Sequence, residues 1–229
     1  MRVAVLGPLA LEGPQGIVAV PGRKARELLT ALALASPEAM SLERLVDLLW
    51  SDPPPSAVKV VQAHASRLRR ALRDAGAPDA LRGTGAGYRL DLEGRAGGPP
   101  DRRHRDLDRS LDRRLDRFEL EVARRQAEAA RDRGESHLAV EWFAAARAQW
   151  RGEPELPDTP AGQAVRRRLH DERLELAIAH LACVVDTDVP ERAVPELAEL
   201  VAAEPLNERL WELRILALYR SGRPTEALR

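Results

Sequence analysis

The sequence contains one cysteine, Cys183, which excludes an internal disulfide bond and any cysteine-rich metal site. Cys183 lies within a helical pattern of apolar residues, where it is expected to be a small core residue. No stretch reaches the roughly 18 apolar residues of a membrane span. The apolar start, Met1–Leu9, is too short for a signal peptide with its cleavage site. We therefore expect a cytoplasmic protein with no membrane partner.

A net charge is also lacking, because 36 basic and 36 acidic residues cancel. Total charge therefore does not predict a nucleic-acid partner. The distribution along the chain does, since residues 1–92 carry a net charge of +3, residues 93–117 of +2 and residues 118–229 of −5. The positive charge lies in the N-terminal part of the chain.

The sequence has none of the patterns that would predict an enzyme. A Gly-x4-Gly-Lys-Ser/Thr motif is absent, and Gly83-x-Gly85-x-Gly87 does not open a helix after a strand, as a dinucleotide site requires. His170 and His180 are ten residues apart on one predicted helix, with no cysteine or second cluster nearby. We expect no catalytic residues, no cofactor and no metal.

The most informative stretch runs from Ser56 to Arg73 and predicts an amphipathic helix. Its apolar residues recur at helical spacing on one stripe, which comprises Val58, Val61, Ala65, Leu68 and Leu72. Pro53–Pro55 cannot continue a preceding helix, and Ser56 can cap the next one. The sequence around Gly76 predicts the end of the helix.

The opposite side of this helix is basic. It carries Lys59, Ala63, Ser66, Arg67 and Arg70, with Val60, His64 and Arg69 on its flanks. A helix exposed only to water would mix acidic and basic residues, whereas the one acid here, Asp74, lies just past the end. Such a helix suits the DNA major groove, where arginine pairs with guanine and alanine contacts a thymine methyl. A solvated basic face without a ligand is the alternative.

Residues 1–92 predict an α+β domain. Short strands are expected at residues 3–6, 9–11 and 17–20, helices at 23–35 and 42–50, then the basic helix and a hairpin at 81–92. In the second of these helices, Ser41 is expected to cap and Glu43 and Arg44 to face water. A small strand meander must pack against helices to be stable.

Residues 93–117 interrupt the pattern and predict a charged linker with a lead-in helix. Gly94–Pro100 has linker composition, and one helical face would hold Leu107, Leu111, Leu115 and Phe118. Residues 118–229 predict an all-α, tetratricopeptide-like domain with helices at 118–133, 136–150, 163–186, 191–203, 207–221 and from 224, and a loop at 151–162.

The helical part contains a partial repeat. Gly134-x4-Ala139 and Gly222-x4-Ala227 share one turn-to-helix spacing, and Ala193 lies 34 residues before Ala227, the length of one tetratricopeptide repeat. Asp188 stands where the middle repeat would have glycine.

Several motifs resemble a known family. Ser66–Arg70 matches the end of the recognition helix of OmpR-type winged helix-turn-helix domains, and Gly87–Leu90 the returning arm of their wing. Over nearly the whole length the chain resembles the Streptomyces antibiotic regulatory protein family, whose second part is the bacterial transcriptional activation domain. The other matching stretches are Leu6–Leu9, Gly22–Leu29, Ser41–Trp50, Trp150–Gly152, Leu210–Trp211 and Ala217–Leu228.

The resemblance implies a two-component-like effector domain in a sequence-specific activator, often of an antibiotic or other secondary-metabolite gene cluster. It further implies double-stranded DNA as partner, with direct repeats at promoters, recruitment of RNA polymerase, a homodimer on tandem repeats, and a nucleoid location. Three departures stand out. The 93–117 segment is longer than usual, Thr84 replaces a wing arginine, and the chain stops inside a helix that the family continues.

The expected DNA contacts follow from this assignment. Base edges would be contacted by Val60, Ala63, His64 and Arg67, with Arg67 as the guanine reader. Phosphates would be contacted by Lys59, Ser66, Arg69, Arg70, Arg82 and Arg89. Because Thr84 replaces arginine, Arg82 or Arg89 takes over base contact in the wing, or the wing contacts only the DNA backbone. For His64 the alternative, equally supported, is a structural role as a partly buried histidine without base contact.

Two further expectations concern proteins as partners. OmpR-type activators contact polymerase through the loop between the helix at 42–50 and the basic helix, and the resemblance implies Trp50, Ser51 and Asp52 as the contacts here. The alternative is that this loop is only a rigid spacer between the helices. The alternative function is a helical-repeat interaction scaffold with a degenerate winged-helix docking module. A scaffold of this kind would show little salt-dependent affinity for DNA.

Overall fold

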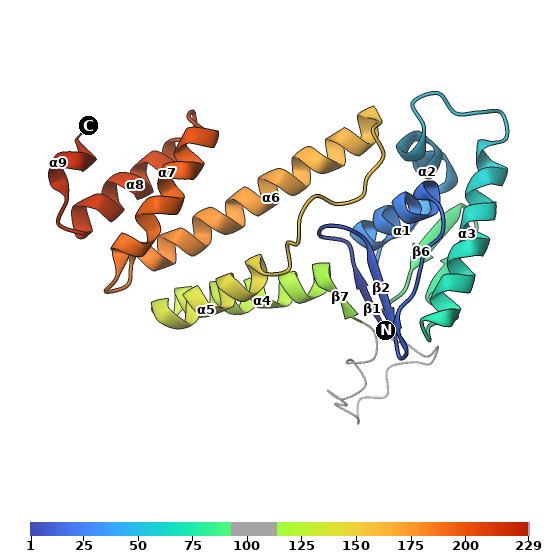
Figure 1. The fold of residues 1–229 in the computed structure, drawn as a ribbon, viewed down its shortest axis with the longest axis horizontal. Helices are drawn as coiled ribbons and strands as arrows, with labels where there is room; N and C mark the ends of the chain where they lie inside the picture. The colour runs from blue at the N-terminus through green and yellow to red at the C-terminus, as the bar shows by residue number, and fades with distance from the viewer. Residues whose placement is uncertain (93–113, 229) are drawn as a thin grey trace. The chain divides into compact units, whose positions relative to one another are not determined.

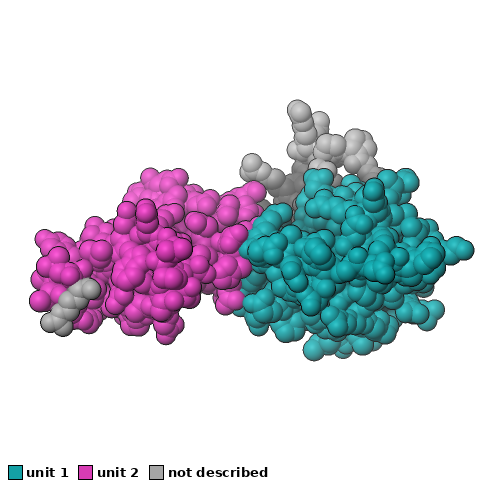
Figure 2. All heavy atoms as spheres, turned by 90° about the horizontal axis from the view of Figure 1, so that it is seen from above, with its two compact units in different colours: residues 1–119, 150–168 teal, residues 120–149, 169–229 magenta. Residues whose placement is uncertain are grey.

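The computed structural model describes residues 1–92 and 114–228 (Figure 1). They form two compact units, residues 1–119 with 150–168 and residues 120–149 with 169–229 (Figure 2). The division into functional domains at 1–92, 93–117 and 118–229 stays a prediction, and residues 93–113 lie outside the described part. Among the described residues, no helix is both long and apolar enough to cross a membrane.

The first unit begins with a four-stranded sheet of order β3-β2-β1-β7. β1 (Arg2–Ala4), β2 (Ala10–Gly13) and β3 (Gly16–Ile17) are antiparallel, so the predicted meander is present. Its first and third strands are shorter than expected, because β1 ends at Ala4 and β3 ends at Ile17. β7 (Arg114–Leu115) pairs parallel to β1, with Leu115 opposite Val3. The predicted lead-in helix is therefore wrong at Leu115, because the open edge of β1 takes this short segment as a strand. Leu107 and Leu111 lie outside the described residues.

Three helices pack together and form the core of the first unit. They are α1 (Arg23–Ala35), α2 (Leu42–Leu49) and α3 (Ala57–Asp74). The fully buried side chains include Leu28, Leu29, Leu32, Leu45, Leu49, Leu68 and Leu72. The bounds of α1 agree with the prediction at both ends. Ser41 caps α2 as expected, because its hydroxyl accepts a hydrogen bond from the backbone nitrogen of Arg44 at 3.2 Å.

The predicted hairpin is confirmed and belongs to a second sheet of order β4-β6-β5. β5 (Leu81–Gly83) pairs with β6 (Gly87–Leu90), and β4 (Met40–Ser41), which was not predicted, pairs with the other side of β6. A Cβ atom at Gly87 would lie 1.9 Å from the carbonyl oxygen of Met40. Only glycine therefore permits the close approach of β4 to β6.

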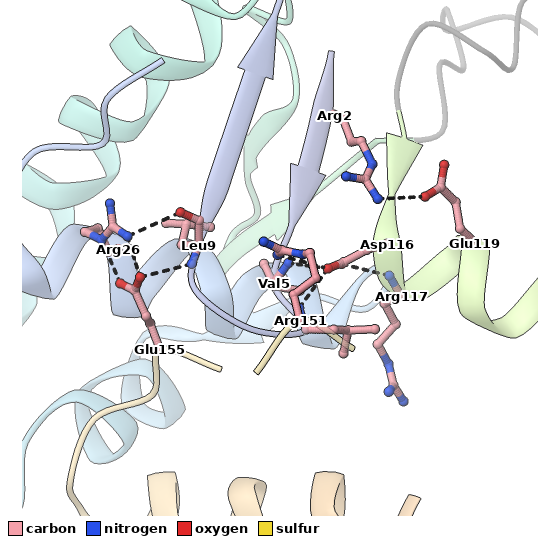
Figure 3. Close-up of polar contacts among 10 residues, drawn as sticks. Arg2, Val5, Leu9, Arg26, Asp116, Arg117, Glu119, Arg151 and Glu155 are labelled. Atoms are coloured by element: carbon pink, nitrogen blue, oxygen red, sulfur yellow. Dashed lines mark hydrogen bonds and ion pairs between the residues drawn. The ribbon is translucent and has the colours of Figure 1, made fainter. Parts of the chain in front are cut away.

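The first residue of α4 (Asp116–Asp132) is an aspartate whose carboxylate accepts hydrogen bonds from the backbone just after β1 (Figure 3). Asp116 is fully buried, and its Oδ2 accepts hydrogen bonds from the backbone nitrogens of Val5 at 2.7 Å and Leu6 at 2.8 Å. Arg151 lies 3.6 Å from the same oxygen. Burial raises the pKa of Asp116 above its ordinary value, although the backbone hydrogen bonds and Arg151 act in the opposite direction.

Residues 150–168 belong to the first compact unit, although we expected them in the helical domain of residues 118–229. Glu155 accepts hydrogen bonds from Arg26 of α1, from Nε at 2.6 Å, and from the backbone nitrogen of Leu9 at 3.0 Å (Figure 3). The hydroxyl of Thr159 donates to the carbonyl oxygen of Leu48 in α2 at 2.7 Å. These contacts fix the orientations of α1 and α2 from outside the 1–92 segment.

The second unit is helical. It contains the greater part of α4, then α5 (Ser136–Arg147), the C-terminal part of α6 (Pro160–Val185), a 3₁₀ turn η2 (Pro190–Ala193), α7 (Val194–Ala203), α8 (Glu208–Arg220) and α9 (Pro224–Ala227). Its core includes Ile178, Leu181, Leu197, Val201 and Leu210. The predicted helices are present, with α5 ending three residues earlier and α6 starting three residues earlier than expected.

The structure supports the expected repeat in this unit. Gly134 and Gly222 both adopt the left-handed conformation, with φ of 74° and 73°, in the turns before α5 and α9. Ala139 and Ala193 are both fully buried after their turns. Asp188 has no positive φ, so the middle turn is built differently from the other two.

Candidate nucleic-acid interface

The buried face of α3 is an alanine-rich stripe that packs against α1 and α2. Ala57, Val61, Ala65, Leu68 and Leu72 are buried. The prediction that Val58 belongs to this stripe is wrong, because its side chain is 44% exposed. Ala57, which lies four residues before Val61, is buried where Val58 was expected to be. The buried stripe is therefore rotated slightly about the helix axis from its predicted position.

The two ends of α3 have different hydrogen-bond arrangements. Ser56 occupies the N-cap position, but its side chain makes no capping hydrogen bond, so the prediction of a serine cap is wrong. The backbone nitrogen of Ala57 instead donates to the carbonyl oxygen of Pro54 at 2.8 Å. At the other end Gly76 has φ of 85°, and the backbone nitrogen of Ala77 donates to the carbonyl oxygen of Leu72 at 2.8 Å. The helix therefore ends at the glycine, as predicted.

The outward face of α3 carries positive charge that no carboxylate neutralises within the described residues. Lys59, Ala63, Ser66, Arg67 and Arg70 are all exposed. Neither Lys59 nor Arg67 nor Arg70 forms an ion pair with a carboxylate in the part of the chain that the structure describes. Gln62 and Arg73 are also exposed on this helix, and sequence reasoning gave them no role although their positions flank the basic face.

Val60 and His64 lie on one flank of this face and are half-buried. Burial, reinforced by the charges of Arg67 and Lys24, lowers the pKa of His64 below its ordinary value. Its Nδ1 is buried without a hydrogen-bond partner among the described residues. His64 is therefore a partly packed side chain whose surroundings disfavour the protonated form, and its base contact stays a prediction.

Arg69 lies on the other flank and links α3 to the hairpin. Its Nε donates to the carbonyl oxygen of Leu81 at 3.4 Å, and its guanidinium lies 5.5 Å from the centre of the Tyr88 ring. This half-buried arginine links α3 to β5 and β6. Its phosphate contact stays a prediction.

The hairpin β5–β6 presents two arginines that share one counter-ion. Arg82 and Arg89 lie opposite each other in the register, at 3.4 Å and 3.9 Å from Asp91 Oδ2. Both side chains are about two-fifths exposed (43% and 42%). The hydroxyl of Thr84 accepts a hydrogen bond from the nitrogen of Gly87 at 3.0 Å, so this threonine closes the turn at the tip.

The predicted polymerase loop follows α2. Ser51 and Asp52 are exposed, whereas Trp50 is half-buried and packs against the core. The ammonium group of Lys24 lies 5.4 Å from the centre of the Trp50 ring and also donates to the carbonyl oxygen of Leu49. Trp50 is thus the anchored end of a loop whose remaining residues face water.

The histidines that could have suggested enzymatic chemistry have separate partners. His170 pairs with Glu204 at 3.1 Å, and the Nδ1 of His180 lies 2.7 Å from Arg147. Within residues 1–92 and 114–228, no group of three or more His, Cys, Asp or Glu side chains is arranged to hold a metal ion.

Comparison with protein families gives two matches along the chain. Residues 20–90 match the family described as "Transcriptional regulatory protein, C terminal", which covers α1–α3 and the hairpin. Residues 115–229 match the family described as "Bacterial transcriptional activator domain".

Similar proteins are bacterial regulators. The chain is 36% identical over 236 residues to the regulatory protein AfsR of Streptomyces coelicolor, which covers all of this chain and 21% of AfsR. It is 30% identical over 239 residues to the regulatory protein DnrI of Streptomyces peucetius, covering all of this chain and 81% of DnrI. The chain thus spans about a fifth of AfsR and most of DnrI.

One solved structure has the same fold. It is Mycobacterium tuberculosis EmbR in complex with a low affinity phosphopeptide, with a TM-score of 0.82 and 24% sequence identity. The match covers 99% of this chain and 56% of EmbR. The fold is therefore a winged helix followed by a helical activator domain.

Proposed function

Because the chain belongs to the Streptomyces antibiotic regulatory protein family of transcriptional regulators, we propose that it activates transcription by binding promoter DNA through α3 and the β5–β6 hairpin. Direct repeats near promoters of a secondary-metabolite gene cluster are the proposed sites, with two copies of the chain on tandem repeats. On this proposal the protein acts at the nucleoid.

The observation that carries the proposal is the uncompensated charge on the outward face of α3. Lys59, Arg67 and Arg70 face water without a carboxylate partner in the described structure, and the small residues Ala63 and Ser66 lie between them. DNA phosphates would supply the missing negative charge, and the small side chains would allow the helix to approach base edges. A helix exposed only to water gains nothing from collecting like charges.

The proposed roles separate base contact from backbone contact. Arg67 reads guanine, with Val60, Ala63 and His64 beside it at base edges. Lys59, Ser66 and Arg70 contact phosphates and set the register of the helix, and Arg69 adds a contact from the hairpin side. Arg82 and Arg89 already share Asp91, so a phosphate would compete with that carboxylate for them.

Recruitment of RNA polymerase is the second half of the proposal. The exposed residues Ser51 and Asp52 extend from Trp50, whose packing against the core and Lys24 gives the loop a fixed base. A partner that docks on this loop would meet a preorganised surface, which reduces the entropic cost of binding.

The experiment is a titration of the purified chain with genomic DNA fragments, followed by footprinting of those that bind. We expect protected direct repeats and a log K that falls steeply and linearly with log salt concentration. Transcription in vitro with RNA polymerase on a protected promoter should then rise when the chain is added. Binding without any salt dependence, or no binding in dilute buffer, would favour the interaction scaffold instead.

A further inference from the structure

Glu27 is a buried carboxylate that gathers two cations at the start of α1. Its side chain is 2% exposed, and Arg23 Nε donates to its Oε1 at 2.8 Å. Lys24 Nζ lies 3.1 Å from its other oxygen, Oε2. The cluster therefore holds two positive charges against one negative charge and keeps a surplus of one.

The two cations are bound to different extents. Lys24 also donates to the carbonyl oxygen of Leu49 and lies over the Trp50 ring, so its position is fixed from several sides. Arg23 has a 78% exposed side chain and uses only Nε on Glu27 within the described residues. Its two terminal nitrogens therefore have no protein partner within the described residues.

The cluster lies at the start of α1, a helix that packs against α3. Arg23 and Lys24 contact the two oxygens of one carboxylate, so the two cations lie together at this end of the helix. The charge of Lys24 also acts on His64 of α3.

The position of the two cations is unfavourable for the helix itself. The first turn of α1 contains Arg23 and Lys24 and no acidic residue. The positive end of the helix dipole lies there, and it disfavours cations. A local arrangement that opposes stability in this way is expected at functional sites, where an external group supplies the compensation.

We propose that Arg23, oriented by Glu27 together with Lys24, binds a backbone phosphate of the duplex next to the segment that α3 contacts. This contact rests on the proposed function and extends the DNA footprint from α3 to α1. An arginine with two free terminal nitrogens can bind phosphate through two parallel hydrogen bonds. The contact is independent of base sequence and adds affinity and register.

The test compares Arg23→Ala with a matched control, Arg125→Ala. Arg125 pairs with Glu121 at 3.1 Å in α4 with the same four-residue spacing, and its side chain is 73% exposed. Both substitutions remove one charge and one helical ion pair, but only Arg23 belongs to α1, the helix that packs against α3 and that the proposal places on DNA. The full chain is titrated against a fluorescently labelled mixed-sequence duplex, and against a footprinted duplex, at several salt concentrations.

We expect Arg23→Ala to reduce the slope of log K against log salt by about 0.9, the contribution of one phosphate. Its affinity for both duplexes should fall by the same factor, whereas Arg23→Lys should retain most of the slope and Arg125→Ala should match the wild type. A slope unchanged by Arg23→Ala, or reduced equally by Arg125→Ala, would refute the contact while leaving the proposed function standing. A wild-type chain that does not bind either duplex would refute both. Circular dichroism of each variant confirms that the fold is retained.

Discussion

Asp116 Oδ2 lies 2.7 Å from the backbone nitrogen of Val5, although 111 residues separate the two in the chain. The same oxygen accepts from Leu6, and Oδ1 accepts from the nitrogen of Arg117 at 2.9 Å. A residue within the helical family match thus completes the hydrogen bonding of the first strand of the winged unit. The first compact unit therefore includes residues from the start of the helical family match, and Asp116 stabilises the strand end of that same unit.

Asp116→Ala should lower the free energy of unfolding by about 2–5 kcal/mol, because it leaves the backbone nitrogens of Val5 and Leu6 buried without an acceptor. Urea denaturation followed by circular dichroism measures the change. Asp188→Ala is the control, since Asp188 is 80% exposed and its one ion pair among the described residues is with His137. It should change stability by no more than about 0.5 kcal/mol. Equal midpoints for the two variants would show that the Asp116 hydrogen bonds contribute nothing.

Glu155→Gln should remove a pH-dependent part of the stability. The hydrogen bond from Arg26 holds the pKa of Glu155 below its ordinary value, so the folded state binds this proton less tightly than the unfolded state. The stabilisation is present above the ordinary pKa and is lost as pH falls through the depressed pKa. Both side chains are about a third exposed (33% and 31%), so we expect only about 1 kcal/mol at neutral pH.

The measurement for Glu155 is the free energy of unfolding of wild type and variant at a series of pH values. The difference between them should be largest near neutral pH and should shrink in acid. Glu153→Gln, a change at an exposed neighbour, should differ little from wild type at every pH. A Glu155→Gln difference that does not change with pH would contradict the assignment.

Gly87→Ala should disrupt the sheet that supports the hairpin, because the new Cβ would lie 1.9 Å from the carbonyl oxygen of Met40 in the neighbouring strand. We expect a loss of about 3 kcal/mol, at the upper end for overpacking. Gly85→Ala is the matched control at the hairpin turn, since no atom lies within 4 Å of a Cβ there. The measurement is the thermal unfolding of both variants. Equal stabilities would mean that β4 does not pair closely with β6.

Elements with strong periodicity could be predicted from the sequence, and isolated short pairings could not. α1 agrees at both ends, and α3 differs by one residue at each end. The strands β4 and β7 have two residues each, too few for any alternation, and their partners lie far away in the chain. Periodicity also locates the buried side of a helix only approximately, which is why Val58 was assigned to the wrong side.

The packing of residues 150–168 with the winged unit could not be predicted for a related reason. Glu155 and Thr159 bond to Arg26, Leu9 and Leu48 across more than a hundred residues, and single polar residues in a loop give no local signal of such partners. The basic face of α3 was predictable because its residues recur at helical spacing within one helix. The cluster at Glu27 was not, because only the fold reveals that this glutamate is buried.

The division of roles on α3 can be tested with two substitutions on one helix. Arg67→Ala should cost about 1–3 kcal/mol of binding free energy at a site that contains its cognate guanine and little where that base is replaced. Arg70→Ala should weaken binding to all sequences alike and reduce the salt slope by about 0.9. Both residues are exposed in the structure, so neither change should alter the fold. The measurement is the affinity of the wild type and of each variant for the footprinted duplex and for versions with single base replacements. If both variants lost affinity equally on every duplex, Arg67 would be a phosphate contact like Arg70, and sequence recognition would have to come from other residues of α3 or from the hairpin.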